Sequence, residues 1–436
     1  MRKILLAAAI AAALAPCAAL ATDGYFAHGY GMKAKGRAGA STAMATDSFG
    51  GATNPATMVY VGDRLDLGVD WFSPDRSASR TGSFGGAGFI DGAANGNEVS
   101  SFLIPEFGYN KMLAPNMSLG ITVYGNGGMN TEYASGQLDQ GVCMGGAPNG
   151  QPANLLCGSG ALGVDLMQLI LAPTLAYKMS NGHAFGVSPL IGYQRFKAYG
   201  LQPFAAISSD PANLTNNGYD DAWGFGVRFG YYAQLSPSVA IGAAYSTKIN
   251  MSEFEKYKGL FAEHGDFDIP ENYNIGIAFK ATPKLTLAAD YQQINYSGVA
   301  SVGNPSNVPG VGAAQLGASS SSIGFGWDDV SVIKLGVEYQ WDSKLLLRAG
   351  YNRTDNPIQA RDVTFNILAP GVVTDHITLG FTYTLQSGSE ITVAYMHAFE
   401  NSVTGPSNNP NFPTGGATET ITMSQNSLGI AWGWKF

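Results

Sequence analysis

Three basic side chains occupy positions where they could hold an anionic group inside the protein: Arg228, Lys334 and Arg348. Each lies in a segment where apolar and polar residues alternate, and each falls on the polar face. A carboxylate drawn out of water needs a cation or hydrogen-bond donor beside it. We therefore treat these three residues as candidate ligand-binding residues. A second interpretation, in which the cations only pair with acids such as Glu338, stays open.

A second candidate site is an apolar stripe at i, i+3, i+6 and i+7, a spacing typical of one face of a short helix. The stripe consists of Phe254, Tyr257, Leu260 and Phe261. Burying a hydrocarbon chain there would stabilise a complex by about 0.8 kcal/mol per CH₂. The stripe could therefore capture an apolar ligand, or it could pack its own segment against residues 197–221. The two interpretations are compatible.

The sequence contains no pattern of residues that predicts catalysis or metal binding. His376 and His397 flank neighbouring alternating segments, but no nucleophile accompanies them as a Ser-His-acid site requires. The histidines are scattered and form no Cys/His cluster with metal-ligand spacing. We therefore expect no enzyme activity, no cofactor and no metal site.

The start of the chain directs it to export. Residues 1–21 begin with Arg2 and Lys3, continue with an apolar run and end in small residues, as signal peptides do. We expect cleavage before Thr22, whereas lipidation of Cys17 is the competing interpretation, disfavoured by the preceding proline. Removing the two basic residues takes the formal net charge from −8 to −10. Such an acidic chain argues against nucleic acid as a partner.

The composition points to a protein that crosses a membrane in strands. Charged residues make up 13% of the chain, against about 25% in soluble domains. The 436 residues include 57 Gly, 21 Tyr and 22 Phe, but the mature chain has no apolar run near the roughly 20 residues of a spanning helix. Backbone groups in hydrocarbon must be paired internally, which leaves a closed barrel as the non-helical solution.

Fourteen segments alternate with period 2 and approach the roughly 9 to 11 residues that a tilted spanning strand needs. Short turn-forming connections alternate with long ones, as in barrels with periplasmic turns and extracellular loops. A soluble β-sandwich also alternates, but here Tyr and Trp border the apolar faces, as aromatic girdles do. We therefore predict an all-β fold, a 14-stranded antiparallel transmembrane β-barrel over residues 65–436 with seven long extracellular loops. The predicted strands are 65–72, 99–110, 117–125, 165–178, 184–196, 222–235, 238–248, 272–280, 284–295, 331–340, 344–352, 374–386, 389–399 and 424–436.

Residues 22–64 do not alternate and are rich in Gly, Ala and small polar residues. We expect them to fold back into the lumen as an N-terminal plug, or hatch. A disordered periplasmic tail is the alternative. The final strand, whose outward face reads Leu, Ile, Trp, Trp and Phe, has inward Gly429, Ala431 and Gly433, which leave room for the plug or a ligand.

Glycines stand at the end of the third predicted strand, at Gly125, Gly127 and Gly128. They weaken strand pairing and permit a kink, which a lateral opening in the wall would require. The plain start of a loop explains them equally well.

In the loop that follows, Cys143 and Cys157 are the cysteines left after cleavage. We expect them to form a disulfide in the oxidising exported setting, with a stabilisation of about 3 kcal/mol.

Five stretches of the mature chain, taken in order, resemble the FadL-type outer-membrane transporters of long-chain fatty acids and other hydrophobic compounds, a family that includes aromatic-hydrocarbon channels. The motif Asn-Pro-Ala alone is weak, but the ordered set is specific. The resemblance implies a fourteen-stranded barrel with an N-terminal hatch, which agrees with the strand count. The stretches are Gly36–Gly39 followed by Asn54, Pro55 and Ala56, then Phe254–Pro270, Gly324–Gly336, Arg348–Pro357 and Tyr395–Ser402.

This resemblance also implies how the protein works and where. It implies passive uptake in the Gram-negative outer membrane, by loop capture, binding in the lumen and lateral release through the wall. The partners would be a long-chain fatty acid or another hydrophobic ligand, outer-membrane lipid and lipopolysaccharide, and the barrel assembly machinery. We expect a monomer. The alternatives are a diffusion porin for small hydrophilic solutes, which a plug would disfavour, and a hydrocarbon-specific channel.

Overall fold

The computed structural model describes residues 22–86, 90–138, 143, 152–306, 315–408 and 416–436. The predicted signal peptide, residues 1–21, lies outside these ranges. Among the described residues, no helix is both long enough and apolar enough to cross a membrane.

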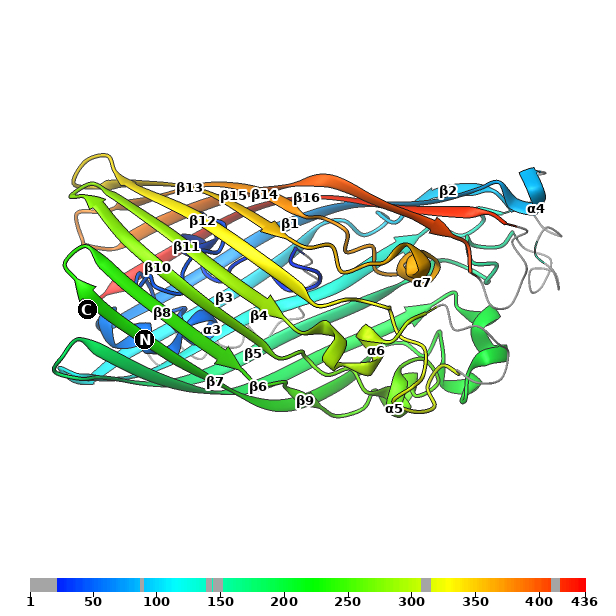
Figure 1. Ribbon diagram of the computed structural model, residues 1–436, viewed down its shortest axis with the longest axis horizontal. Coiled ribbons are helices and arrows are strands. Elements are labelled where there is room, and N and C mark those ends of the chain that lie inside the picture. The colour runs from blue at the N-terminus through cyan, green and yellow to red at the C-terminus, as the bar shows by residue number, and fades with distance from the viewer. Residues whose placement is uncertain (1–21, 87–89, 139–142, 144–151, 307–314, 409–415) are drawn as a thin grey trace.

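One closed antiparallel barrel of fourteen long strands makes up most of the described chain, which confirms the predicted fold (Figure 1). Neighbouring strands pair in chain order, and β1 pairs with β16 along its whole length to close the barrel. Two short strands, β2 (Gly92–Asn95) and β9 (Asn250–Met251), extend the sheet beside β1 and β7. The long strands are β1 (Arg64–Thr81), β3 (Phe102–Ala114), β4 (Met117–Tyr133), β5 (Leu162–Lys178), β6 (His183–Tyr199), β7 (Asp220–Ser236), β8 (Val239–Ser246), β10 (Asn272–Thr282), β11 (Leu285–Ile294), β12 (Val330–Gln340), β13 (Leu345–Thr354), β14 (Asp375–Thr384), β15 (Glu390–Pro406) and β16 (Thr418–Lys435).

Side chains along each strand alternate between the outer wall and the lumen. On β12, Ile333 and Leu335 face outward with 52% and 47% of their surface exposed, whereas Lys334 between them is buried in the lumen. The terminal strand follows the same rule, since Leu428 and Ile430 are exposed while Gly429 faces inward. Apolar side chains thus cover the outer wall, as contact with lipid requires.

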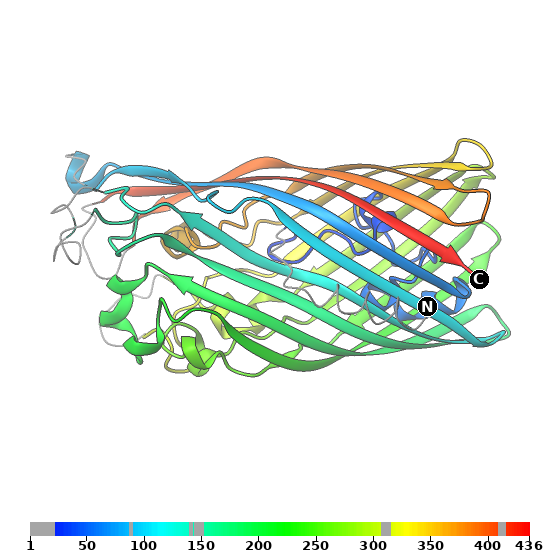
Figure 2. The same cartoon turned by 180° about the vertical axis from the view of Figure 1, so that it is seen from behind.

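The two ends of the barrel differ in their connections. The short connections, such as the one between Ala114 and Met117, lie at one end of the barrel together with the C-terminus (Figures 1 and 2). The opposite end carries the long loops with the short helices α4 (Ser83–Gly86), α5 (Ala262–Gly265), α6 (Ala300–Gly303) and α7 (Val363–Asn366). The short turns mark the periplasmic end and the long loops the extracellular end.

Several strands run further toward the extracellular end than the sequence predicts. β1 extends to Thr81, β4 to Tyr133 and β15 to Pro406, so the predicted loops 73–98, 126–164 and 400–423 are wrong in part. The extension of β1 pairs with β16 residue by residue, for example Ser77 with Thr422. These extensions carry polar residues because their backbone pairing continues beyond the apolar band, where an apolar face is no longer needed.

Residues 22–60 lie inside the barrel, where the dark blue ribbon runs in both views (Figures 1 and 2). This luminal N-terminal segment contains α2 (Met32–Lys35), α3 (Gly50–Thr53) and a 3-10 helix, η1 (Pro55–Tyr60). Most of its side chains are buried. Met32 packs against Gly429 of the closing strand, where a β-carbon would collide with its sulfur. The inward glycine therefore makes room for this segment.

Candidate functional site

Strands β3 and β4 pair only in their periplasmic parts and separate toward the extracellular end. Their pairing runs from Ala114 with Met117 up to Phe107 with Val123. Above that level β3 pairs with β1 from Phe102 to Glu106, and within the described strands it has no β4 partner there. β4 continues along β5 instead, with a register shift between Gly125 and Gly127 at the predicted glycines. A bulge of this kind bends a strand and interrupts its pairing on one side.

Backbone of the luminal N-terminal segment lies against β4 at this bulge. The Ala27 amide donates to the Asn126 carbonyl at 3.0 Å, and the Gly128 amide donates to the Tyr25 carbonyl at 3.1 Å. A β-carbon at position 127 would collide with the Tyr25 carbonyl, so this close approach requires glycine. The segment therefore covers the inner side of the place where β3 and β4 part.

Three basic side chains at alternate positions bind this segment to three different strands. Lys33 pairs with Glu390 of β15 at 2.6 Å, and Lys35 pairs with Asp70 of β1 at 2.5 Å. All four side chains are at least nine-tenths buried. Breaking such a pair leaves an uncompensated buried charge, which costs about 3–5 kcal/mol.

The third basic residue of the series, Arg37, reaches Glu338 of β12 at 2.5 Å. Glu338 is also the partner of Arg348 at 2.6 Å, so one carboxylate serves two guanidinium groups. Sequence reasoning missed the three basic residues at 33, 35 and 37 as anchors, although their i, i+2, i+4 spacing opposite luminal acids was a usable signal. We call these ion pairs the latch.

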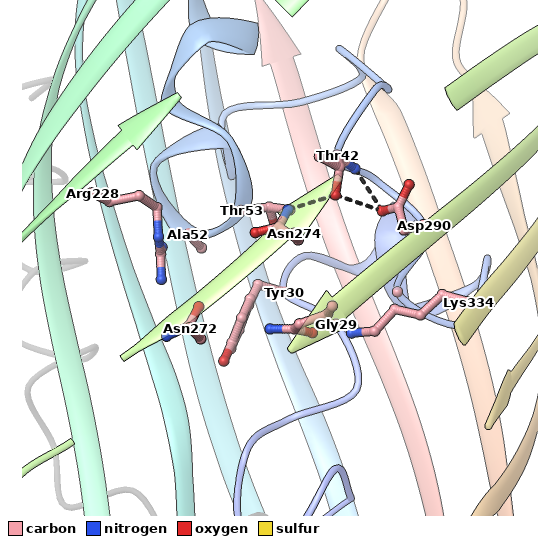
Figure 3. Close-up of a pocket in the computed structure, with 12 residues that line it drawn as sticks. Gly29, Tyr30, Thr42, Ala52, Thr53, Arg228, Asn272, Asn274, Asp290 and Lys334 are labelled. Carbon is pink, nitrogen blue, oxygen red and sulfur yellow. Dashed lines mark hydrogen bonds between the residues drawn. The ribbon is translucent and has the colours of Figure 1, made fainter. Parts of the chain in front are cut away.

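A small polar cavity lies between the luminal segment and the wall (Figure 3). Asp290 accepts hydrogen bonds from the Thr42 amide and hydroxyl at 2.8 and 2.7 Å, and the Asn274 amide donates to the Thr42 hydroxyl at 2.6 Å. Arg228 and Lys334 enter from opposite sides of the view. The cavity thus brings together two of the three predicted cations.

The three predicted cations differ in their partners. Arg228 donates to the Ser246 hydroxyl, the Gly51 carbonyl and the Tyr124 hydroxyl, and no acid among the described residues pairs with it. Lys334, in contrast, pairs with Asp23 at 3.2 Å. Arg348 shares Glu338, as described above. Among the three, Arg228 is therefore the cation whose hydrogen-bond partners are all uncharged.

The predicted hatch motif joins the luminal segment to β6 and β7. The Asn54 side chain donates to the Thr42 and Tyr231 carbonyls and accepts from the Ala56 amide. Pro55 and Ala56 lie against Gly186 and Gly230, where no β-carbon would fit. The motif thus anchors η1 at a point where two strands carry glycine.

The predicted apolar stripe is buried in the extracellular loops. Phe254, Tyr257 and Phe261 all contact the ring of Phe196 on β6, with centroids 4.7–5.6 Å apart. With Leu260, they belong to one apolar cluster that also contains Leu201 and Phe204 from the neighbouring loop. The interpretation that the stripe packs its own loop therefore describes this structure.

The prediction of a single short helix over the stripe is wrong. A 3-10 helix, η5, covers only Glu255–Tyr257, and α5 begins after Phe261 with φ of 52° at Glu263 and 62° at His264. The left-handed backbone at these two residues breaks helical periodicity. Packing of three aromatic rings around Phe196 outweighs the local helical spacing.

An acidic pair lies beside this loop cluster. Burial, followed by the neighbouring Asp268, raises the pKa of Asp266 to about 7. Asp268 itself accepts from the Met251 amide and pairs with Lys248 at 2.6 Å. Burial also raises the pKa of the Tyr257 hydroxyl. Asp266 is thus a group outside the membrane that titrates near neutral pH.

Cys143 and Cys157 form the predicted disulfide, with their Cα atoms 5.7 Å apart. The described residues contain no group of His, Cys, Asp and Glu side chains placed to hold a metal ion.

Sequence reasoning also missed an aromatic cluster at the boundary between loops and lumen. Tyr25 contacts Tyr296 and Trp327, with ring centroids 5.0 and 5.6 Å apart, and Phe267 at 6.1 Å. All four rings are buried. Their positions are too far apart in the sequence for any local pattern to group them. We call Tyr25, Tyr296 and Trp327 the aromatic wall.

The fold is similar to solved structures of outer-membrane transporters. A Pseudomonas aeruginosa FadL homologue aligns with a TM-score of 0.69 at 15% identity, covering 95% of this chain and 100% of that one. The Pseudomonas putida toluene transporter TodX gives 0.67 at 18% identity, with 95% and 100% covered. The Ralstonia pickettii toluene transporter TbuX gives 0.63 at 20% identity, with 94% and 99% covered. At these identities the likeness shows the fold alone.

The comparison with curated proteins finds no match. The family model described as "Outer membrane protein transport protein (OMPP1/FadL/TodX)" matches residues 8–436, nearly the whole chain. That match agrees with the closed barrel of fourteen long strands and with the apolar outer wall. The chain therefore belongs to the OMPP1/FadL/TodX family of outer-membrane transport proteins for hydrophobic compounds, which are channels and not enzymes.

Proposed function

We propose that this protein takes up long-chain fatty acids or aromatic hydrocarbons passively and releases them sideways into the outer membrane. The observation that carries the proposal is the separation of β3 from β4 above Phe107 and Val123, beside the bulge at Gly125 and Gly127. A ligand that leaves there enters hydrocarbon directly and avoids both the charged lipopolysaccharide layer and the polar lower lumen.

The latch supports lateral release over passage straight through the barrel. Lys33, Lys35 and Arg37 tie the luminal segment to three strands through buried ion pairs. Breaking one such pair costs about 3–5 kcal/mol. Removing the segment during each transport event would break several, whereas the contacts of residues 25–27 with β4 are two neutral backbone hydrogen bonds. The luminal segment thus acts as the hatch, and a wide aqueous pore of the porin type is disfavoured.

The apolar cluster of the extracellular loops provides the entry. Its stripe of Phe254, Tyr257, Leu260 and Phe261 is covered in this structure, so a ligand reaches it when the loops part. Capture then exchanges ring-to-ring contacts for ring-to-ligand contacts. Where the ligand bears a carboxylate, Arg228 is the cation we propose for it, because its charge is not already neutralised by an acid.

Lateral release can be tested with a bulky residue in the gap. We expect Gly125→Trp to reduce uptake of radiolabelled oleate and toluene at least tenfold in cells that lack other transporters of these compounds. The matched control is Leu119→Trp, on the same strand but at a level where β3 and β4 are paired and the side chain faces outward with 48% exposure.

The two variants separate the possible outcomes. Loss of uptake in Gly125→Trp with normal uptake in Leu119→Trp supports lateral release. Equal uptake in both variants and the wild type would refute it. Failure of the wild type to transport either compound, in cells where the protein is present in the outer membrane, would refute the proposed substrate class.

A further inference from the structure

Five polar side chains form a floor beneath the aromatic wall. Lys334, Asn352 and His376 are cross-strand neighbours on the luminal faces of β12, β13 and β14. Asp23 and His28 approach them from the luminal segment: Lys334 pairs with Asp23 at 3.2 Å and donates to the His28 carbonyl at 2.9 Å. The rings of His28 and His376 stack with centroids 6.3 Å apart. We call these five residues the polar floor.

The polar floor contains buried atoms that lack hydrogen-bond partners among the described residues. They are one carboxylate oxygen of Asp23, the amide oxygen of Asn352, Nε2 of His28 and both ring nitrogens of His376. These four residues are no more than 2% exposed. Buried polar atoms in native proteins are nearly always paired, with protein, water or a ligand. Five such atoms at one place therefore point to a bound polar group.

The aromatic wall stands directly on this floor. The Tyr296 hydroxyl donates to the Asp23 carbonyl, and the Tyr25 amide donates to the Tyr296 hydroxyl at 3.1 Å. Trp327 packs on both tyrosine rings and also lines a small pocket together with Arg76, Met129 and Met423. A flat ring in the place of the Tyr296 ring would have its edge at Asp23.

The chemistry of the polar floor determines which functional group a ligand ring can carry on the edge that reaches it. Asp23 and Lys334 neutralise each other, and the ammonium of Lys334 is already occupied by Asp23 and the His28 carbonyl. The free oxygens of Asp23 and Asn352 accept hydrogen bonds, and a neutral imidazole both donates and accepts. A carboxylate has no proton to offer these oxygens. A pure hydrocarbon would leave all five atoms unpaired.

We propose that the polar floor binds the hydroxyl group of a neutral aromatic ligand of the phenol class, whose ring packs against the aromatic wall. The hydroxyl donates to Asp23 or Asn352 and accepts from the His376 imidazole. The inference rests on the proposed uptake of hydrophobic compounds and narrows its substrate class. It follows from the general rule that a site built to hydrogen-bond a hydroxyl rejects the analogue that lacks it.

Three ligands test this proposal: toluene, p-cresol and p-toluate. They share a methyl-substituted benzene ring and differ in the group opposite the methyl, which is hydrogen, hydroxyl or carboxylate. Binding to the purified full-length protein is measured by calorimetry in detergent, with oleate as a further ligand. We expect p-cresol to bind about tenfold more tightly than toluene and more tightly than p-toluate. In His376→Leu, p-cresol should lose about tenfold in affinity while toluene keeps its affinity, because only the hydroxyl loses a partner.

The matched control is His397→Leu, which removes a histidine from the outward face of the neighbouring strand β15, where Nδ1 contacts Asn426. It should leave all affinities unchanged. Asn352→Leu provides a second floor variant if His376→Leu does not fold, as judged by the heat-modifiable migration of the barrel.

Each remaining outcome counts against the inference. Equal binding of p-cresol and toluene to the wild type, or equal losses in a folded floor variant, would mean that the floor holds only water. Tighter binding of p-toluate would assign the site to carboxylates. Binding of oleate without any of the three aromatic ligands would overturn this inference and leave the proposed function standing, whereas no binding of any of the four would overturn both.

Discussion

Replacing Glu338 by glutamine removes the carboxylate that two buried guanidinium groups share. Arg37 lies 2.5 Å and Arg348 2.6 Å from the same oxygen, and the Glu338 side chain is 11% exposed. Loss of one partner from a buried ion pair costs about 3–5 kcal/mol, because a charge remains without compensation. At 1.4 kcal/mol per factor of ten, the equilibrium between the docked and undocked states of Arg37 shifts by roughly 10²- to 4 × 10³-fold.

Hydrogen exchange of the luminal segment measures this loss. We expect amides around Arg37 to exchange at least 10²-fold faster in Glu338→Gln, since local opening governs their exchange. Single-channel recordings should also show larger or more frequent openings, because the segment blocks the lumen. The two other latch pairs, at Lys33 and Lys35, remain and should keep the barrel folded.

The control for Glu338→Gln is Lys111→Met, which breaks an ion pair with Asp63 in which the lysine side chain is 50% exposed. Exposed pairs contribute about 0–1 kcal/mol, so exchange and conductance should stay near the wild type. Unchanged exchange around Arg37 in Glu338→Gln would show that the shared carboxylate does not hold the segment.

Three further predictions concern the gap, the loops and pH. Gly127→Val should push the backbone at Tyr25 away from β4 and raise ion conductance in planar bilayers, whereas wild-type conductance would show that the contact is dispensable. Replacing Cys143 and Cys157 by serine should speed protease cleavage of their loop without changing the heat-modifiable migration of the barrel. Burial beside a second carboxylate raises the pKa of Asp266 from 3.8 to about 7. The folded loop therefore holds a proton that the unfolded loop loses, and its stability falls as pH rises from about 4 to about 7. Asp266→Asn should abolish this fall, measured by hydrogen exchange corrected for intrinsic rates; a loop equally protected at pH 5 and 8 in the wild type would contradict it.

The strands of the barrel were predictable because a spanning strand must carry an apolar side chain at every second position. The outward Ile333, Leu335, Ile377 and Leu379 follow from that requirement alone. Where the strands leave the apolar band, as β1 does after Phe72, the requirement ends. Pairing then continues with polar residues, so the sequence did not reveal the true length of these strands.

The helix expected over Phe254 to Phe261 shows the opposite case. Its apolar spacing is helical, but the backbone follows the contacts of three rings with Phe196 on a distant strand. Local spacing identified residues that would be buried together. It did not identify the surface that buries them, since that surface comes from another part of the chain.

The sequence by itself determined that the chain is exported, that it crosses the outer membrane in fourteen strands, and that Arg228, Lys334 and Arg348 face the lumen. Only the tertiary structure decided which charges are neutralised. Glu338 meets a guanidinium 301 residues earlier in the chain. Alternation specifies the face of a side chain but not its height in the barrel or its partner across the lumen. Those depend on how the barrel closes and how the luminal segment packs inside it.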